Sequence, residues 1–323
     1  MFRTEITMPS SPVRIDHQSG ILTIGSCFSD VMGEKLLKNK FNVLANPFGV
    51  VFNPESIFTL LNASLDNNEF FNDGYIQNNN IWHNYYFHSE LYGDTFEELS
   101  KKINEQKILT HKFLLNAKIL TITFGTAYVY RLKSNHELVS NCHKMPSSLF
   151  TKELLKAEQI TKSFDIFYKK IITANPGLKI ILTVSPVRHT KDSIQLNSVS
   201  KSVLRLACHS LAAANENISY FPAYEIMMDD LRDYRFYKED MIHPTAVAEN
   251  YIWEKFIDTY METQSKEFIR EWSGILKGLQ HKPFHPESES HQAFIKETIR
   301  KVKSLSSRAD LRIELNMLEL QLK

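Results

Sequence analysis

The chain has 323 residues, of which 43% are hydrophobic and 23% are charged. This length and composition suit one large α/β domain, alone or with an appended helical piece, and they exclude a chain that is disordered throughout. The 38 Lys and Arg residues balance 37 Asp and Glu residues, giving a net charge of +1. Such a balance offers no electrostatic basis for binding nucleic acid or an anionic membrane surface.

The spacing of the cysteines and the lengths of the apolar runs limit the possible cofactors and cellular locations. Cys27, Cys142 and Cys208 show no CxxC spacing, so neither a disulfide framework nor a zinc cluster is indicated. We predict no metal and no cofactor. The first residues lack the apolar core of a secretion signal, and no apolar run reaches transmembrane length. We therefore expect a cytoplasmic protein that does not bind membranes.

The clearest local pattern lies near the N-terminus. Residues 21–24 form an apolar, β-branched run that ends at Gly25 and Ser26, and residues 29–40 carry apolar side chains at helical spacing. A strand, a tight turn and a helix in this order are typical of the start of a parallel α/β sheet.

The next segments are less regular. The apolar stretch 41–51 contains the loop-forming residues 46–49, and a helix is predicted to begin at Pro54. Residues 67–84 are rich in Asn and aromatic side chains, and we interpret them as an insertion or irregular loop.

Strands and helices then alternate. Strands are predicted at 118–124, 179–184 and 218–221, with helices at 152–174 and 198–214 between them. This alternation predicts a doubly wound parallel sheet with functional loops at the carboxyl ends of its strands.

The C-terminal part has a different character. After a predicted helix over 246–261, residues 282–290 form a polar linker with prolines, and apolar residues at helical intervals over 291–323 predict a helix or helical hairpin. We therefore divide the chain into an α/β domain, 1–262, and a C-terminal helical extension, 263–323. The extension is expected to pack on the body or on a second subunit, which makes it a candidate homodimer contact.

Ser26 occupies the turn between the first strand and the first helix. A hydroxyl there lies at the positive end of a helix, where an acyl-transfer nucleophile is well placed. The commoner use of serine at such a position is to cap the helix. The neighbouring Cys27 is expected to point away from the cleft, into the helix packing, as a buried small thiol.

A second chemical pattern precedes the helix that is predicted over 246–261. Asp240 lies three residues before His243 on one short segment, followed by Pro244. A carboxylate at this spacing can accept the imidazole Nδ1–H, which leaves Nε2 free as a general base. A surface pair or a helix cap is the alternative interpretation.

These two patterns together resemble the block layout of the SGNH (GDSL-like) hydrolases. Within them, the motif GSCF at 25–28 resembles that of the GSCFA-domain family. Further segments similar to that family are NPFGVVFNP at 46–54, TFGTAYVY at 123–130, NCHK at 141–144 and SPVRH at 185–189. The resemblance runs over roughly residues 5–260.

The resemblance implies a flavodoxin-like three-layer α/β/α fold and a catalytic triad of Ser26, His243 and Asp240. It also implies an oxyanion hole made by the nucleophile's own N–H, by the N–H of Gly49 and by an asparagine at position 127. This chain has Ala127 instead. The candidate replacements for the asparagine are Thr126, Asn141 and His143.

Three residues are candidates for binding substrate. Arg188 and His189 follow the predicted strand 179–184, at the same end of the sheet as Ser26, and could hold a carboxylate or sugar hydroxyls. Helix capping or a salt bridge is the alternative for this pair. His143 is the third, with an ordinary loop residue as its alternative.

The sequence thus predicts a serine esterase that removes or transfers a small O-acyl group, such as acetyl, from a small-molecule or oligosaccharide ester. Two other functions stay open. The first is a catalytically impaired ligand-binding protein, suggested by the missing asparagine. The second is an oligomerising scaffold that acts through the C-terminal helices.

Overall fold

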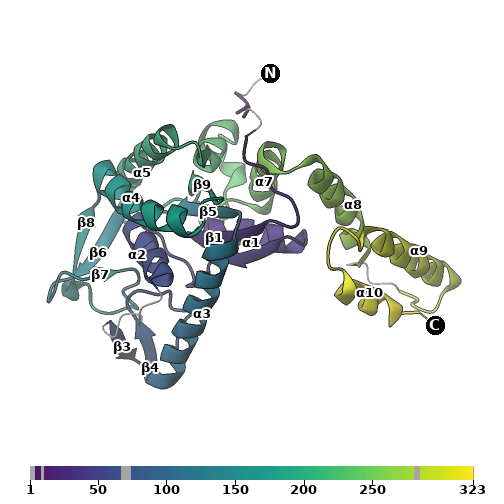
Figure 1. Cartoon of the computed structure of the whole chain (residues 1–323), viewed down its shortest axis with the longest axis horizontal. Helices are drawn as coiled ribbons and strands as arrows, with labels where there is room; N and C mark the ends of the chain where they lie inside the picture. The colour runs from purple at the N-terminus through teal and green to yellow at the C-terminus, as the bar shows by residue number, and fades with distance from the viewer. Residues whose placement is uncertain (1–3, 9–10, 67–73, 280–283, 323) are drawn as a thin grey trace.

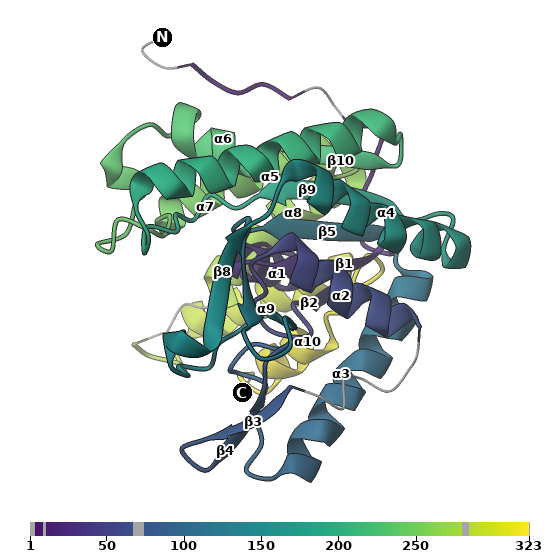
Figure 2. The same cartoon turned by 90° about the vertical axis from the view of Figure 1, so that its left-hand side faces the viewer.

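The centre of the molecule is a parallel β-sheet with the strand order β2–β1–β5–β9–β10 (Figures 1 and 2). The structure is a computed structural model that describes residues 4–8, 11–66, 74–279 and 284–322. The strands are β1 (Gly20–Gly25), β2 (Asn42–Ala45), β5 (Ile119–Phe124), β9 (Lys179–Val184) and β10 (Ile218–Phe221). Their order is that of flavodoxin-like sheets, so the predicted α/β fold with a parallel sheet is confirmed.

Helices cover both faces of this sheet. On one face, Ile21, Ile119 and Ile181 pack with α1 (Cys27–Lys38) and α7 (Ala246–Tyr260). The other face packs against α2 (Pro54–Leu65), α3 (Phe96–Asn116), α4 (Ala157–Ala174) and α5 (Ile194–Ala214). Because both faces are buried, the central strands consist mainly of large apolar residues with buried threonines among them, which is why the sequence shows them clearly.

Two antiparallel additions flank the helical layer. Strands β6 (Tyr128–Leu132), β7 (Leu138–Val139) and β8 (Phe150–Leu154) form a small sheet that we call the β6–β8 arm. The short 3-10 turn Ser147–Leu149 leads into β8. The helix predicted over 152–174 begins only at Ala157, because the preceding residues pair with β6.

The segment predicted as an irregular loop contains a hairpin. Strands β3 (Tyr75–Asn78) and β4 (Ile81–Asn84) pair antiparallel. Asn79 and Asn80 connect them, both with positive φ, 51° and 63°. Asparagine tolerates this left-handed conformation, which a two-residue hairpin turn requires. Residues 67–73 of the predicted loop lie outside the described residues.

The C-terminal helices form a hydrophobic cluster of their own beside the sheet domain (Figure 1). They are α8 (Thr263–Leu279), α9 (Glu289–Leu305) and α10 (Arg312–Glu319), of which the sequence predicted only the last two. Trp272 is fully buried, and its Nε1 donates a hydrogen bond to the Lys38 carbonyl at 2.9 Å. The Phe268 and His17 rings meet edge to face, 4.3 Å between centroids. These contacts join the two parts.

The N-terminal segment runs along the far end of the sheet domain. Ile15 donates a backbone hydrogen bond to Tyr260 and accepts one from Glu262, at 2.9 and 3.1 Å. These two bonds fix the segment around Ile15, which we call the strap, to the junction between α7 and α8. No helix among the described residues is long and apolar enough to cross a membrane.

Short turns join β10 to α7. They are α6 (Ala223–Glu225), the π-helical turn η2 (Ile226–Asp230) and the 3-10 turn η3 (Tyr234–Phe236). The loop that follows η3 brings residues 237–245 to the carboxyl edge of the sheet, next to the ends of β1, β5 and β9.

Candidate functional site

A cavity of about 410 Å³ opens at the carboxyl edge of the sheet. Several parts of the chain supply its wall: Cys27 begins α1, Thr126 follows β5, His189 follows β9, and His243 precedes α7. The remaining lining residues are Phe52, Tyr128, Tyr130, Lys152, Val187, Arg188, Thr190, Lys191, Asp192 and Ile242. The cavity therefore lies where ligands bind in open α/β sheets.

Ser26 is the N-cap of helix α1. Its side chain accepts a hydrogen bond from the Phe28 N–H at 3.4 Å, its own N–H donates to the Thr123 carbonyl, and the residue is 1% exposed. Gly25 closes the strand before it with φ of +143°, where a Cβ would lie 2.1 Å from the Thr123 carbonyl oxygen. Ser26 is absent from the cavity lining, and no hydrogen bond joins it to His243 among the described residues.

Cys27 faces the cavity, contrary to the expectation from the sequence. It is the first residue of α1 and is partly exposed. The sequence placed Cys27 one position past the turn and pointing into the helix packing, whereas α1 begins at Cys27 and this residue lines the cavity. Burial raises the pKa of its thiol, and the negative charges of Asp30 and Glu90 act in the same direction.

Asp240 and His243 form a hydrogen-bonded pair at the rim. Asp240 Oδ2 lies 2.7 Å from His243 Nδ1, while Oδ1 accepts the N–H groups of Ile242 and His243 at 2.8 and 2.9 Å. These bonds lower the pKa of Asp240 to about 2. The carboxylate therefore stays charged and fixes the ring with Nε2 available, and Nε2 has no hydrogen-bond partner in the described part of the chain.

The groups expected to form the oxyanion hole are engaged elsewhere, which corrects that prediction. The Ser26 N–H donates to Thr123, the Gly49 N–H donates to Asn46 at 2.8 Å, and the Thr126 N–H donates to Phe52 at 3.1 Å. These donors close the turns that shape the loops, so in this structure they are not directed at a ligand. Of the residues named, Thr126 alone lines the cavity, and its hydroxyl contacts Ser200 Oγ at 3.1 Å.

Asn141 and His143 lie apart from the cavity, which corrects their predicted roles there. Asn141 Oδ1 accepts the His143 N–H at 2.9 Å. The His143 ring is 3.1 Å from Ser89 Oγ through Nδ1 and 2.9 Å from the Asn84 carbonyl through Nε2. Burial lowers the pKa of His143 to about 4. Both residues therefore hold the loop after β7 against the end of the β3–β4 hairpin.

Arg188 and His189 are both in the cavity wall, and their surroundings differ. The Arg188 guanidinium lies over the Tyr237 ring, 3.9 Å from its centroid. His189 Nε2 is buried without a hydrogen-bond partner among the described residues. Burial and the positive charge of Lys201 lower the pKa of His189 to about 3, so its imidazole is neutral at physiological pH.

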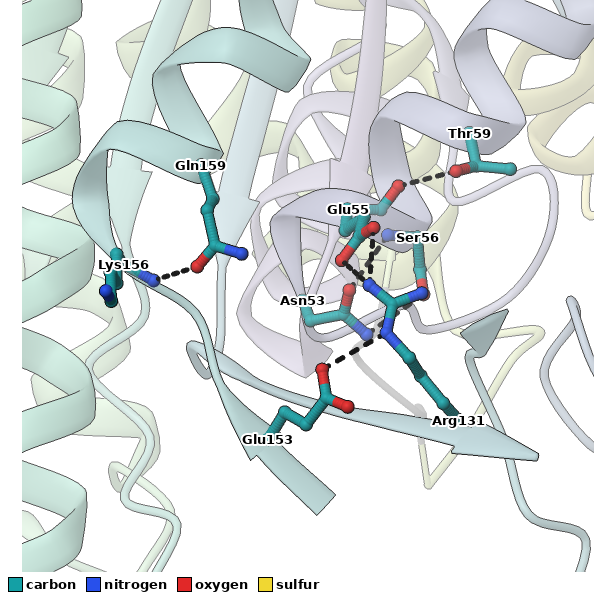
Figure 3. A network of polar contacts seen from close by, with 8 residues as sticks. All are labelled: Asn53, Glu55, Ser56, Thr59, Arg131, Glu153, Lys156 and Gln159. Atoms are coloured by element: carbon teal, nitrogen blue, oxygen red, sulfur yellow. Dashed lines mark hydrogen bonds and ion pairs between the residues drawn. The ribbon is translucent and has the colours of Figure 1, made fainter. Parts of the chain in front are cut away.

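The β6–β8 arm forms the aromatic side of the cavity. Lys152 Nζ lies over the rings of Tyr128 and Tyr130, 4.4 and 5.6 Å from their centroids, and pairs with Asp192. Figure 3 shows how Arg131 anchors this arm to the first turn of α2. Its Nη2 is 2.7 and 2.8 Å from the two carboxylate oxygens of Glu55, and its Nε is 3.2 Å from Glu153.

Sequence reasoning did not identify Lys201 on α5, a fully buried lysine beside the site. Its Nζ donates to the carbonyls of Gly125 and Ser185, both at 2.8 Å. These carbonyls lie directly after β5 and β9. The signal that could have revealed it is a lysine on the apolar stripe that includes Leu204 and Cys208, at helical spacing.

The comparisons with known proteins place the chain in a family. Its sequence matches the profile of the GSCFA family over residues 20–256, and residues 272–323 match the C-terminal domain of GSCFA domain proteins. Since the first match alone covers well over half of the chain, the protein belongs to the GSCFA family.

Two further comparisons add little. No curated protein sequence matches this chain. Among solved structures, a carbohydrate esterase of family 3 from Talaromyces cellulolyticus is similar with a TM-score of 0.34 and 8% sequence identity, over 80% of this chain and 99% of that one. At this identity and TM-score, the similarity says nothing about the activity of this chain.

Proposed function

We propose that this protein is an ester hydrolase or acyl transferase whose general base is His243. The observation that supports this most strongly is the 2.7 Å contact between His243 Nδ1 and a carboxylate, on the rim of a cavity that also contains the N-terminus of α1. Such a pair fixes the tautomer and stabilises the imidazolium that forms when Nε2 accepts a proton. The nucleophile comes from the β1–α1 turn, where the sequence predicts Ser26.

The reaction has two acyl-transfer steps. The nucleophile attacks the carbonyl carbon of the ester as His243 Nε2 accepts its proton, and the proton then passes to the departing alcohol. Water or an acceptor alcohol next attacks the acyl-enzyme with His243 again as base. The chain's own residues supply every proton transfer in this scheme.

His189 is the group that we propose to stabilise the oxyanion in place of the missing asparagine. Its imidazole is neutral, the residue lines the cavity, and its buried Nε2, beside Gly125, has no hydrogen-bond partner among the described residues, so the ring must turn for Nε2 to reach a substrate. A neutral imidazole with a proton on Nε2 can donate a hydrogen bond to a developing negative charge. Removing a donor of this kind typically lowers kcat by about 10²–10³.

The chemistry of the wall suggests a substrate with polar groups. The tyrosines of the β6–β8 arm, Lys152 and Arg188 offer ring faces and hydrogen-bond donors, which suit an acylated carbohydrate. We propose a small O-acyl group, such as acetyl, on such a substrate.

A ligand-binding protein without turnover is the second candidate function. The observation that favours it is that the N–H groups expected to hold an oxyanion donate to carbonyls within the fold. Under this proposal the cavity binds the same polar ligands, but His243 contributes affinity and no rate.

Hydrolysis of p-nitrophenyl acetate and butyrate by wild type, His243→Ala, Asp240→Asn and His189→Ala decides between the two candidates. We expect His243→Ala to lose at least 10²-fold in kcat/KM, the scale of general-base catalysis. Asp240→Asn and His189→Ala should lower kcat with their folds intact by circular dichroism. The matched control is His136→Ala on the β6–β7 turn, away from the cavity lining, which should keep wild-type rates.

A rate for His243→Ala equal to that of wild type would reject the enzymatic proposal. In that case, saturable binding of an acylated sugar, measured by calorimetry and weakened by Arg188→Ala, would favour the binding protein.

A further inference from the structure

The β1–α1 turn carries two potential nucleophiles next to each other, and the structure gives them different surroundings. The Ser26 hydroxyl faces the helix backbone as the N-cap, and only 1% of the residue is exposed. Attack by Ser26 would require its hydroxyl to leave the cap and the residue to become accessible. Its own N–H is also bonded to Thr123, so it could not serve as an oxyanion donor without breaking a contact between strand ends.

Cys27 is more accessible than Ser26, and as with Ser26 no hydrogen bond joins it to His243 among the described residues. Its side chain is partly exposed and lines the same cavity as His243. As the first residue of α1, it lies at the positive end of the helix. Across the part of the chain that the structure describes, no other residue accepts a hydrogen bond from its N–H. That N–H is therefore available to the oxyanion that forms on the carbonyl oxygen when the cysteine sulfur attacks the ester.

We propose that the sulfur of Cys27 is the nucleophile of this enzyme, with His243 as its base and Asp240 as the residue that orients His243. Ser26 is then a positioning residue that caps α1 and fixes the first turn. This inference rests on the proposed acyl-transfer function, and it changes the class of the enzyme from a serine esterase to a cysteine-dependent one.

The step balances with the groups present. The thiol gives its proton to His243 Nε2 while Sγ forms a bond to the acyl carbon, and the carbonyl electron pair moves to the oxyanion. When the carbonyl re-forms, the bond to the alcohol oxygen breaks, and that oxygen takes the proton from His243. The resulting thioester is then attacked by water, which gives its proton to His243. The carbon–sulfur bond breaks, and the sulfur recovers that proton.

The surroundings of the thiol make this reaction depend on the base. Burial, together with the charges of Asp30 and Glu90, raises the pKa of Cys27, so the resting residue is a neutral thiol. The thiolate is the reactive form of cysteine. Removal of His243 should therefore suppress the reactivity of Cys27 towards any electrophile, whether or not it resembles the substrate.

Alkylation by iodoacetamide tests this without a substrate. Peptide mass spectrometry measures the labelling rates of Cys27 and Cys142 in wild type and in His243→Ala at neutral pH. Cys142 is an internal reference, because it is also partly exposed and its pKa is also raised by burial, but it does not line the cavity. We expect Cys27 labelling to fall at least tenfold in the variant with Cys142 unchanged. Equal Cys27 rates in the two proteins, or no Cys27 labelling in wild type, would overturn the proposal.

A second experiment tests the proposal with a substrate, by locating the acyl group on the enzyme. Wild type quenched in acid during turnover of p-nitrophenyl butyrate should carry the butyryl group on Cys27, located by peptide fragmentation, and neutral hydroxylamine should remove it as a thioester. Cys27→Ala should lose turnover, and Cys142→Ala should keep it. Because the alanine variant could fail to fold, Cys27→Ser serves as the near-isosteric second variant and should lose at least tenfold in rate.

The two proposals fail in different ways. An adduct on Ser26, or full turnover by Cys27→Ala, would overturn the assignment of Cys27 and leave the esterase proposal in place. Absence of turnover in wild type would count against the esterase proposal, while the alkylation experiment would still decide whether His243 activates Cys27.

Discussion

Lys201 ties together the two strand ends that carry Thr126 and His189 to the cavity. Its ammonium donates to the Gly125 and Ser185 carbonyls at 2.8 Å, and the residue is 1% exposed. Complete burial lowers its pKa to about 7. Its positive charge also lowers the pKa of His189, so one buried lysine joins the ends of β5 and β9 and helps to keep the neighbouring imidazole neutral.

This burial predicts an unusual pH dependence of stability. An unfolded lysine has a pKa of about 10.4, so between pH 7 and 10 the unfolded chain holds more protons at this residue than the folded one. The free energy of unfolding of the wild type should therefore rise with pH relative to Lys201→Met, by up to about 1.4 kcal/mol per pH unit. Urea denaturation at pH 7, 8, 9 and 10 measures the difference.

The matched control for this experiment is Lys101→Met, which removes an exposed lysine from α3. Its difference from wild type should stay constant over the same range. A Lys201→Met difference that is also constant, or that moves in favour of the variant as pH rises, would contradict the prediction.

At the residue level, the sequence predicted contacts between residues that are close in the chain, but it did not predict the directions of side chains. Asp240 and His243 are three residues apart, so their contact could be predicted from the sequence. The directions of Ser26 and Cys27 depend on where α1 begins, and a shift of two residues in a helix start rotates a side chain to another side. The neutral state of His189 depends on Lys201, which α5 brings beside it and which sequence spacing does not reveal.

At the level of elements, the strands that the sequence predicted are those buried on both faces of the sheet. The central strands are almost wholly buried and mostly apolar, and they were predicted. Helix α3 was not, because its buried face includes Lys107 and Thr110 as well as leucines, which interrupts the apolar stripe. The β6–β8 arm was missed because its strands are only partly buried, and β8 was assigned to the helix that follows it.

Arg131 should control how firmly this arm is held. Arg131→Met removes the paired contact with Glu55 and the contact with Glu153, and it should lower the free energy of unfolding by about 1 kcal/mol, since the side chain is 21% exposed and solvent screens the pair. Because Tyr128 and Tyr130 come from the same strand, KM should rise more than kcat falls. Urea denaturation and steady-state kinetics measure the two effects.

Arg300→Met provides the comparison for Arg131→Met. Arg300 makes a similar paired contact with Glu297, at 2.8 Å through each nitrogen, but on the exposed face of α9. Its removal should change stability less and leave KM unchanged. A larger effect for Arg300 than for Arg131 would show that the arm does not depend on its anchor.

For the whole molecule, the packing of α8, α9 and α10 determines how the C-terminal part is attached. The apolar residues that predicted helices in this region mostly pack against one another, including Ile295, Val302 and Leu318. Ile313, Met317 and Leu320 remain exposed. A homodimer formed through these helices stays a prediction, and analytical ultracentrifugation of wild type and Met317→Glu would test it.

Trp272 links the C-terminal helices to the sheet domain. Trp272→Ala should destabilise the protein by about 3–5 kcal/mol, because it empties a fully buried site and removes the bond to the Lys38 carbonyl. Hydrogen exchange should then accelerate in α8 and α9 before it does in the central sheet. Ile313→Ala, on the exposed face of α10, is the control and should change neither property. Equal acceleration in sheet and helices would indicate that the two parts unfold together.

The strap at Ile15 also has a consequence for the order in which the molecule is completed during its synthesis. Among the described residues, Ile15 has its backbone partners at Tyr260 and Glu262, which follow almost the entire sheet domain in the sequence. A ribosome that adds about 5–20 residues per second reaches them roughly 10–50 s after it has made Ile15. The backbone groups of Ile15 therefore lack these partners while β1, β5 and β9 are synthesised and come together. The strap is among the last pieces of the sheet domain to dock, although it is made before β1.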